Sequence, residues 1–262
     1  MRTVPEFDIT MTATLRPDLI ERTLSSHTKY LFKECICKAR LIINIDFAGE
    51  ENLKLQTAKF IRIIELLDNY PFRAVTFRPG NDPDFARAFF WCHDNTTSDY
   101  VFNLEEDWEM KYPIDFFEMF RMMERDTTIA HLRLSAFVSE EGTCKNWNKF
   151  TYWNGYFFEV TPAERGIIGW CGHPSLNKRS FLSDVLRYCD RTKNPEKQIK
   201  AKRHPHPINM LISSHRFGVF TPQRHPKVVE DIGRSWMVNH GYEKEGNKAF
   251  FTQWRKVSKN ER

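Results

Sequence analysis

The chain of 262 residues is long enough to bury one sizeable hydrophobic core, or one core with a small subdomain. Its content of 41% hydrophobic and 14% aromatic residues excludes an intrinsically disordered chain. The formal net charge of +5 is too small for a dedicated nucleic-acid-binding protein. Lysine, arginine and histidine residues nevertheless concentrate between residues 197 and 206, where a polyanionic partner could bind.

The first half of the chain, taken in order, alternates between apolar runs and segments with helical spacing of apolar residues. The predicted strands cover residues 7–12, 39–47, 72–77 and 99–104. The predicted helices cover residues 18–27, 57–69 and 84–93. This alternation predicts an α/β fold, in which helices flank a mostly parallel central sheet.

The second half is less regular. Its predicted elements are helices at 114–124, 179–188 and 233–242, strands at 129–137, 150–160 and 217–220, and a loop at 166–173. Residues 194–207 are polar and basic. No repeat or clear linker is present, which predicts one domain over residues 1–262.

The cysteines and the apolar runs indicate where the protein resides. The six cysteines form no CxxC pair and match no zinc spacing, so we expect reduced thiols and a cytoplasmic protein. No apolar run approaches about 18 residues, so no membrane span is expected. The N-terminus also lacks the apolar core of a signal peptide.

Polar residues collect where the predicted strands of the first half end. These residues are Thr14, Arg16, Asp46, Asn81 and the acidic triplet Glu105-Glu106-Asp107. Ligands of open α/β sheets bind at the carboxyl ends of the strands. A rigid acidic turn at such an end suits Mn²⁺ or Mg²⁺, which prefer carboxylate oxygens and leave positions open for a diphosphate. The alternative is a solvated acidic turn, but its place after the fourth strand favours a metal site.

The same segments resemble a known family. The segment DYVFNLEEDWEM (99–110) resembles the metal-binding strand of GT-A glycosyltransferases, which ends in a DxD-type triplet and in some members reads EDD or EED. The segments ITMTATLRPDLIERTLSS (9–26) and INIDFAGE (43–50) resemble the first and second strands of family-2-like members. The resemblance covers residues 7–110 and thins beyond them. It implies a GT-A fold and a metal-dependent transfer of a sugar from a nucleotide-sugar donor, most simply a UDP-sugar, to a hydroxyl acceptor.

Carried over position by position, the resemblance implies a role for each strand-end residue. Asp107 would be the principal ligand of Mn²⁺ or Mg²⁺, Glu106 would support it, and Glu105 would face the ribose or the metal. The implied nucleoside-binding residues are Thr14, Arg16 and Asp46. Glutamate replaces the first aspartate of the DxD motif, which leaves the division of labour between the two glutamates open. Residues 1–110 would bind the donor and residues 111–262 the acceptor.

An inverting transfer needs a carboxylate that deprotonates the acceptor hydroxyl. In inverting family-2-like enzymes it lies in an ED-type motif, and the matching stretch here is NPEKQ, with Glu196 as the candidate base and Lys197 in place of the second acid. The alternative is a solvated glutamate in a basic loop. Asp184 and Asp190 are weaker candidates, and a retaining mechanism would need no such base.

Further candidates come from a glycine-containing loop and from the last third of the chain. Trp170 could stack on a sugar or base of the acceptor, or instead belong to the core, and His173 could bind acceptor hydroxyls. A late histidine completes the metal site of many GT-A enzymes, which suggests His225, and Arg234 could steady the leaving diphosphate. The alternatives to His225 are His204 and His206.

Several functions remain open from the sequence. The acceptor could be a cell-surface glycan or lipid-linked sugar, or a hydroxymethylated DNA base of the kind that some phage enzymes modify. A nucleotidyltransferase would share the sheet and the strand-end carboxylates, but its first loop would be rich in glycine, whereas TATLRP contains none. A non-catalytic descendant would have lost the acidic triplet.

Overall fold

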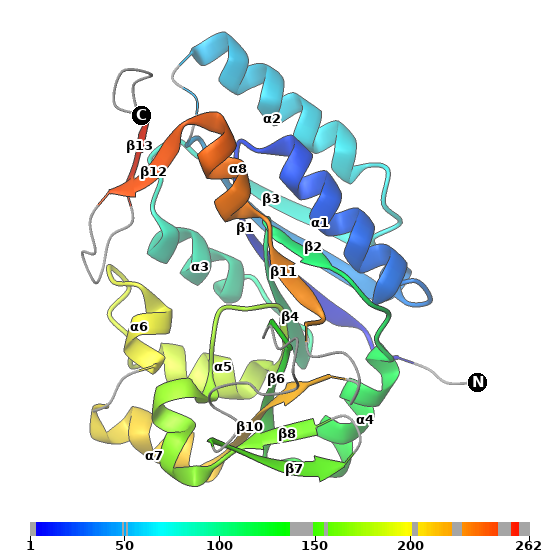
Figure 1. The fold of residues 1–262 in the computed structure, drawn as a ribbon, viewed down its shortest axis with the longest axis vertical. Coiled ribbons are helices and arrows are strands. Elements are labelled where there is room, and N and C mark those ends of the chain that lie inside the picture. The colour runs from blue at the N-terminus through cyan, green and yellow to red at the C-terminus, as the bar shows by residue number, and fades with distance from the viewer. Residues whose placement is uncertain are drawn as a thin grey trace.

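The computed structural model describes residues 4–48, 50, 52–136, 149–154, 157–200, 204–221, 227–245 and 253–256. Its described strands form a nine-stranded sheet in the order β3-β2-β1-β4-β9-β6-β10-β8-β7 (Figure 1). The strand pairings imply that only β8 and β9 run opposite to the other seven. The predicted α/β fold with a mostly parallel sheet is therefore confirmed.

The bounds of the elements are as follows. The strands of the large sheet are β1 (Phe7–Thr14), β2 (Ala39–Asp46), β3 (Ala74–Gly80), β4 (Tyr100–Glu105), β6 (Ile129–Leu134), β7 (Phe150–Asn154), β8 (Phe157–Val160), β9 (Ser175–Lys178) and β10 (Arg216–Phe220). Two ribbons pair β5 (Trp108–Met110) with β11 (Val229–Asp231), and β12 (Tyr242–Glu245) with β13 (Gln253–Lys256). The helices are α1 (Pro17–Tyr30), α2 (Leu53–Leu67), α3 (Phe85–Asp94), α4 (Phe116–Arg125), α5 (Arg179–Leu186), α6 (Pro195–Ile199), α7 (His206–Ser214) and α8 (Gly233–His240).

The two faces of the sheet carry separate hydrophobic clusters, because successive side chains of a strand point to opposite faces. In β4, Phe102 belongs to the cluster beneath α1, α2 and α4, whereas Val101 belongs to the cluster beneath α3, α5 and α7. Figure 1 shows α1 and α2 together on one side of the sheet and α3 on the other. Both faces are covered, so the central strands β1, β2, β4 and β6 are buried along nearly their whole length.

Side chains fix where several helices begin. Asn52, Asp84 and Asp115 each accept hydrogen bonds from backbone N–H groups in the first turn of α2, α3 and α4. Pro17 opens α1, where a missing N–H costs nothing. These starts place the first turns of α1 and α3 beside the carboxyl ends of β1 and β3.

The second half departs from the sequence prediction in several places. The single strand predicted at 150–160 is a hairpin of β7 and β8, and the predicted loop at 166–173 contains a π-helical turn at Arg165–Gly169. Strand β9 was not predicted because it buries polar residues. The Asn177 side chain is hydrogen-bonded to Trp170, His131 and Ser175, so its burial costs little.

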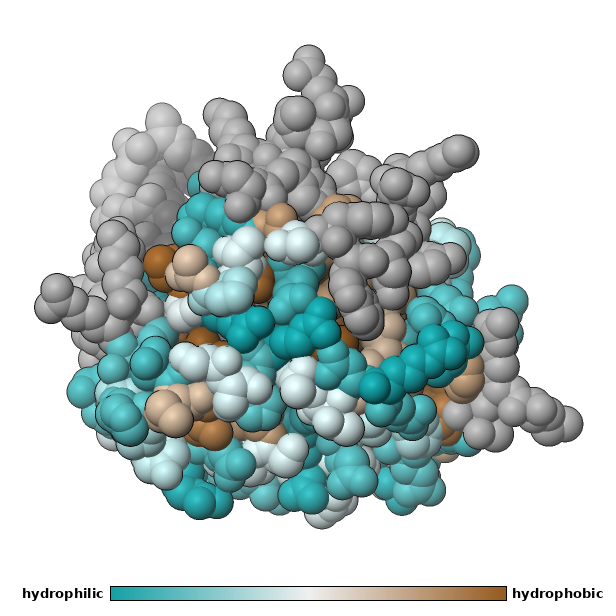
Figure 2. Space-filling model, turned by 90° about the horizontal axis from the view of Figure 1, so that it is seen from below, coloured by the Kyte–Doolittle hydropathy of each residue, from teal (hydrophilic) through white to brown (hydrophobic). Residues whose placement is uncertain are grey.

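The described helices include none that is long and apolar enough to cross a lipid bilayer. Seen from the end at which α7, β7 and β8 lie, hydrophilic residues dominate the described surface, and hydrophobic ones appear as separate spots (Figure 2). The described cysteines, which are Cys35, Cys37, Cys92, Cys171 and Cys189, are free thiols. The cytoplasmic location stays a prediction.

Candidate functional site

Four strands of the first half end side by side at one edge of the sheet. The parallel register pairs Thr14 of β1 with Asp46 of β2, and Asp46 with Gly80 of β3. On the other side of β1, Thr12 pairs with Glu105 at the end of β4. The structure therefore brings the predicted residues of the first loop, the second strand and the acidic turn to the same edge.

Glu106 ties the acidic turn to the first loop. Its Oε1 accepts hydrogen bonds from the Thr14 backbone N–H (3.1 Å), the Thr14 hydroxyl (3.0 Å) and Arg16 Nε (3.1 Å), and it forms an ion pair with Arg16 Nη2. Arg16 is only 4% exposed. Glu106 and Arg16 thus face each other inside the protein, and this geometry favours a positioning role for both.

Asp107 lies beside the amino end of α8, which begins at Gly233. Its Oδ2 is 3.1 Å from Arg16 Nη2, and its carbonyl accepts a hydrogen bond from Ile232 N (2.8 Å). A side chain at Gly233 would clash with the Asp107 carboxylate, so glycine is needed there. Burial, together with the charges of Glu106 and Asp231, raises the pKa of Asp107 to about 7, although Arg16 lowers it.

Glu105 points to the other side of the turn. Its Oε2 accepts a hydrogen bond from Trp108 Nε1 (3.3 Å), and no described lysine or arginine forms an ion pair with it. Burial and the charges of Asp107, Glu196 and Glu106 raise the pKa of Glu105 well above its usual value. A cation bound here would relieve this repulsion.

Glu196 approaches Glu105 across the backbone of Gly172. A methyl group at Gly172 would lie 3.3 Å from Glu105 Oε1 and 3.8 Å from Glu196 Oε2, so the two oxygens are no more than about 7 Å apart. Glu196 also pairs with Lys200 (3.4 Å). The residue predicted as the base is therefore next to the acidic turn, although 91 residues separate it from Glu105 in the chain.

His173 lines the same region, whereas Trp170 does not. The His173 ring lies 4.7 Å from the Trp108 ring. Burial alone would lower the pKa of His173, but the neighbouring Cys171 and Glu196 raise it. Trp170 is 2% exposed, donates its indole N–H to Asn177 and packs edge-on against Phe89. The prediction that Trp170 stacks on a sugar or base of the acceptor is therefore wrong, because the indole is part of the core.

Asp46, Arg234 and His225 complete the predicted set. Asp46 accepts hydrogen bonds from Asn44 Nδ2 (2.7 Å) and the Asp84 N–H (3.1 Å), and burial raises its pKa to about 6. Arg234 is exposed on the first turn of α8, two residues after Ile232. His225 lies outside the described residues.

Known structures share this arrangement of elements. The mannosyltransferase PcManGT from Pyrobaculum calidifontis, solved in complex with GDP-Man and Mn²⁺, matches with a TM-score of 0.56 and 13% sequence identity over 84% of this chain and 55% of that chain. TarS from S. aureus matches with a TM-score of 0.53 and 11% identity over 82% of this chain and 34% of that chain. Residues 1–349 of TarS in complex with UDP-GlcNAc give 0.51 and 11% over 84% and 56%. The chain has the GT-A fold.

The likeness to these GT-A structures concerns the fold. The chain spans between 34% and 56% of the length of these three proteins, and their identities are 11–13%. No protein-family model and no curated protein matches the sequence. The predicted GT-A fold is thus confirmed from structure alone.

The carboxylate oxygens of the acidic turn suit a hard divalent cation whose remaining coordination positions are filled by a bound substrate. Within the described ranges, no three carboxylate, imidazole or thiolate side chains are grouped closely enough to hold a metal by themselves. Two carboxylates with raised pKa values, Glu105 and Asp107, are nevertheless present in the same turn, and the charge of Asp107 contributes to the raised pKa of Glu105. Mg²⁺ and similar ions are commonly held by one or two carboxylates together with substrate phosphates. The residues present therefore fit such an ion.

Sequence reasoning missed four residues that shape this region. Gly172 and Gly233 leave room for Glu105 and Asp107, and Trp108 bonds Glu105. Asp231 accepts the Gly233 N–H (2.9 Å) at the start of α8. The spacing Asp231-Ile232-Gly233 before a helix is a capping signal that could have been found. The two glycines carry no signal of that kind, because their neighbours come from distant parts of the chain.

Proposed function

We propose that the chain is a metal-dependent glycosyltransferase that moves a sugar from a nucleoside-diphosphate sugar to a hydroxyl acceptor. The observation that carries the proposal is the pair of carboxylates, Glu105 and Asp107, at the carboxyl edge of a GT-A sheet, with pKa values raised by burial and by the charges of neighbouring carboxylates. PcManGT, which shares the fold, was solved with GDP-Man and Mn²⁺.

Asp107 and Glu105 would hold Mn²⁺ or Mg²⁺. When bound, the cation would neutralise the charge that develops on the leaving diphosphate. We assign Glu106 to positioning, because its contacts with Thr14 and Arg16 hold the first loop against the acidic turn. Thr14 and Asp46 then line the nucleoside side. Arg234 is exposed at α8 and supplies positive charge for the diphosphate.

We assign the acceptor side to Glu196 and His173. In this scheme the Glu196 carboxylate takes the proton from the acceptor hydroxyl while the hydroxyl oxygen forms a bond to the anomeric carbon. The bond from that carbon to the diphosphate breaks, and the diphosphate leaves with the electron pair. Attack from the face opposite to the leaving group inverts the configuration. The closeness of Glu196 to Glu105 across Gly172 supports this assignment.

A screen of sugar nucleotides with Mn²⁺, followed by product analysis, tests the function. We expect release of a nucleoside diphosphate, with UDP-sugars as the first choice and GDP-sugars as the comparison. Release of pyrophosphate would instead identify a nucleotidyltransferase. Turnover of no sugar nucleotide at all would contradict the proposal.

The base assignment has its own control. Glu196→Gln should retain donor binding and lose transfer by about a hundredfold or more. Asp184→Asn is the matched control, because Asp184 is an exposed carboxylate on the neighbouring helix α5 that pairs with Arg187. Equal losses in the two variants would contradict the assignment of Glu196.

A further inference from the structure

A series of buried polar side chains leads from the middle of the sheet to the proposed acceptor side. His131 on β6 and Asn177 on β9 are directly opposite each other in the antiparallel register, and His131 Nδ1 lies 2.7 Å from Asn177 Oδ1. Cys171 precedes β9, and its Sγ lies 3.9 Å from His131 Nε2. All three residues are completely buried. Polar groups are costly to bury unless they are paired, so the position of each side chain is set by its partners.

Asn177 determines how the His131 ring is turned. The Asn177 Nδ2 group donates hydrogen bonds to Ser175 O (3.0 Å) and Ser175 Oγ (3.1 Å). Trp170 Nε1, which can only donate, bonds to Asn177 Oδ1 (3.2 Å), so this oxygen is an acceptor. His131 therefore carries a proton on Nδ1, which it donates to the same oxygen, and its Nε2 faces the Cys171 sulfur.

His173 is the second partner of the Cys171 sulfur, and the two side chains form a hydrogen bond. Burial alone would raise the pKa of Cys171, but the neighbouring His173 and Arg133 lower it well below its usual value. Negative charge on the sulfur is thus favoured, and the sulfur accepts an N–H of the His173 ring. The two nitrogens of an imidazole point to different sides of the ring, so the second nitrogen of His173 points away from the sulfur.

The Trp108 indole holds the His173 ring from another element of the fold. The two ring centroids are 4.7 Å apart, and the ring planes are inclined by 44°. Trp108 Nε1 also donates to Glu105 Oε2 (3.3 Å). The backbone beside His173 is fixed as well, because Asn103 Nδ2 on β4 donates to Gly172 O (2.7 Å). The His173 ring is therefore placed by the sulfur and by an indole that also contacts a proposed metal ligand.

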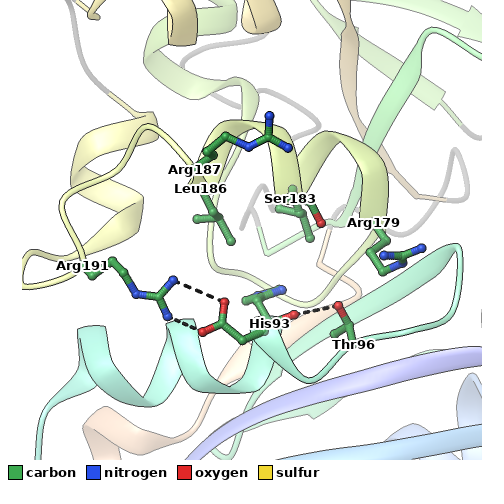
Figure 3. Close-up of a pocket in the computed structure, with 9 residues that line it drawn as sticks. His93, Thr96, Arg179, Ser183, Leu186, Arg187 and Arg191 are labelled. Carbon is green, nitrogen blue, oxygen red and sulfur yellow. Dashed lines mark hydrogen bonds and ion pairs between the residues drawn. The ribbon is translucent and has the colours of Figure 1, made fainter.

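Two other histidines, both buried, show the effect of burial on an imidazole. His93 lies in the wall of a pocket between α3 and α5 (Figure 3), and burial lowers its pKa to about 4. Burial lowers the pKa of His27 in α1 to about 4 as well. In His173, by contrast, the neighbouring Cys171 and Glu196 outweigh burial and raise the pKa. The sulfur thus favours the form of the His173 ring that donates hydrogen bonds from both nitrogens.

We propose that Cys171 is a positioning residue for the transfer. Its sulfur, which is itself held by His131, fixes the His173 ring so that the second ring nitrogen donates a hydrogen bond to the acceptor hydroxyl beside Glu196. Cys171 is completely buried, so it acts through His173 and not by contact with a substrate. This inference rests on the proposed function for the acceptor side, whereas the hold of Cys171 on the His173 ring can be tested without any substrate.

Long-range ¹H–¹⁵N NMR spectra of the histidine rings test this hold in the free protein. C171A should move the two ring-nitrogen signals of His173, which are assigned by their absence in H173Q, toward those of a free imidazole. C92A is the matched control, because Cys92 is also buried and its thiol donates to the Met11 carbonyl (3.4 Å). This control should leave the His173 signals unchanged. The wild-type spectrum should also show a proton on Nδ1 of His131.

C171S is a second variant, for the case that alanine impairs folding. Its hydroxyl group is nearly the size of the thiol but carries no negative charge. The ring signals of His173 should therefore move in the same direction as in C171A, by a smaller amount. Melting temperatures of both variants show whether the fold is intact.

Mn²⁺-dependent turnover of a sugar nucleotide tests whether the hold serves the transfer. C171A should lower kcat about tenfold and leave the affinity for UDP unchanged, because only the acceptor side is misplaced. In the H173Q background the same substitution should change kcat by less than about twofold, since Cys171 acts through His173. C92A should keep the kcat of the wild type.

Two results would overturn the proposal. They are unchanged His173 signals in the folded Cys171 variants, and an equal loss of kcat from C171A with and without His173. If the wild type turns over no sugar nucleotide, the proposed function fails, and the role of Cys171 in transfer fails with it. Displaced His173 signals would then still show that Cys171 holds the ring, so the two failures are distinguished.

Discussion

Carboxylates lie at both ends of the central strands β1 and β4, a single one at the amino end of β1 and the acidic turn at the carboxyl end of β4. Asp8, at the amino end of β1, is completely buried and accepts hydrogen bonds from Arg40 Nε and Nη2 (3.0 Å each), and from the backbone N–H groups of Thr97 (2.6 Å) and Ser98 (2.9 Å). Burial alone would raise the pKa of Asp8, but these partners hold it below its usual value.

The acidic turn at the other end shows the opposite balance. Glu105 and Asp107 have raised pKa values, because burial and neighbouring carboxylates outweigh the contribution of Arg16. The same residue type is thus stabilised as an anion at one end and destabilised at the other. The first arrangement strengthens the fold, and the second is suited to binding a cation.

The largest expected effect is on turnover. Asp107→Asn should lower Mn²⁺-dependent sugar-nucleotide turnover about a thousandfold, because it removes a charged ligand from the proposed metal. Glu109→Gln, in the same acidic segment but paired with Arg22 and Lys111, is the control and should change turnover little. Comparable activity of the Asp107 variant and the wild type would show that the Asp107 carboxylate is not needed for turnover, and would contradict the metal site proposed at the acidic turn.

The next effect is on stability at the structural end. Asp8→Asn should lower the free energy of unfolding by about 3 kcal/mol, because it leaves Arg40 facing a neutral partner. Urea denaturation measures this loss, and donor binding by the folded variant should be unchanged. A stability equal to that of the wild type would show that the charged pair of Asp8 and Arg40 does not stabilise the fold.

The carboxylates at the two ends should also have opposite effects on how stability depends on pH. The pKa of Asp107 is about 7 in the folded protein and near 4 when unfolded, so the folded state binds more protons between these values. Ionisation of Asp107 therefore lowers stability as pH rises from 4 to 7, whereas Asp8, with its lowered pKa, contributes stability that is lost on acidification. Relative to the wild type, Asp107→Asn should gain on the order of 1 kcal/mol between pH 5 and pH 8.

Comparing the two proteins at each pH isolates Asp107, since the buried His27 and His93, with pKa values lowered to about 4, titrate in both. Urea midpoints at the two pH values give the measurement. A constant difference between variant and wild type would mean that the Asp107 carboxylate is not destabilised in the fold.

The smallest effect concerns the space between Glu105 and Glu196. Gly172→Ala would place a methyl group 3.3 Å from Glu105 Oε1, so that carboxylate must move by a few tenths of an ångström. We expect turnover to fall about fivefold and the melting temperature to stay unchanged. A large loss of stability with unchanged turnover per folded molecule would place Gly172 in the fold and not in the site.

The sequence was most informative where the periodicity of apolar residues, or the position of a residue at the end of a strand, was enough to predict the structure. Apolar runs and helical spacing located β1 to β4 and α1 to α3, and the carboxyl-end rule grouped Thr14, Asp46 and the acidic triplet. Polar strand β9 escaped because hydrogen bonds of Asn177 replace the usual apolar pattern. The inward direction of Trp170 depends on packing by distant segments, which no local pattern encodes.

Calorimetric titration of UDP in the presence of Mn²⁺ at pH 8, where Asp107 is mostly ionised, tests the central claim most directly. The wild type should bind UDP with Mn²⁺ and lose this binding with a chelator, and Asp107→Asn should not bind under either condition. Unchanged, metal-dependent UDP affinity in Asp107→Asn would contradict the assignment of the acidic turn as the metal and donor site.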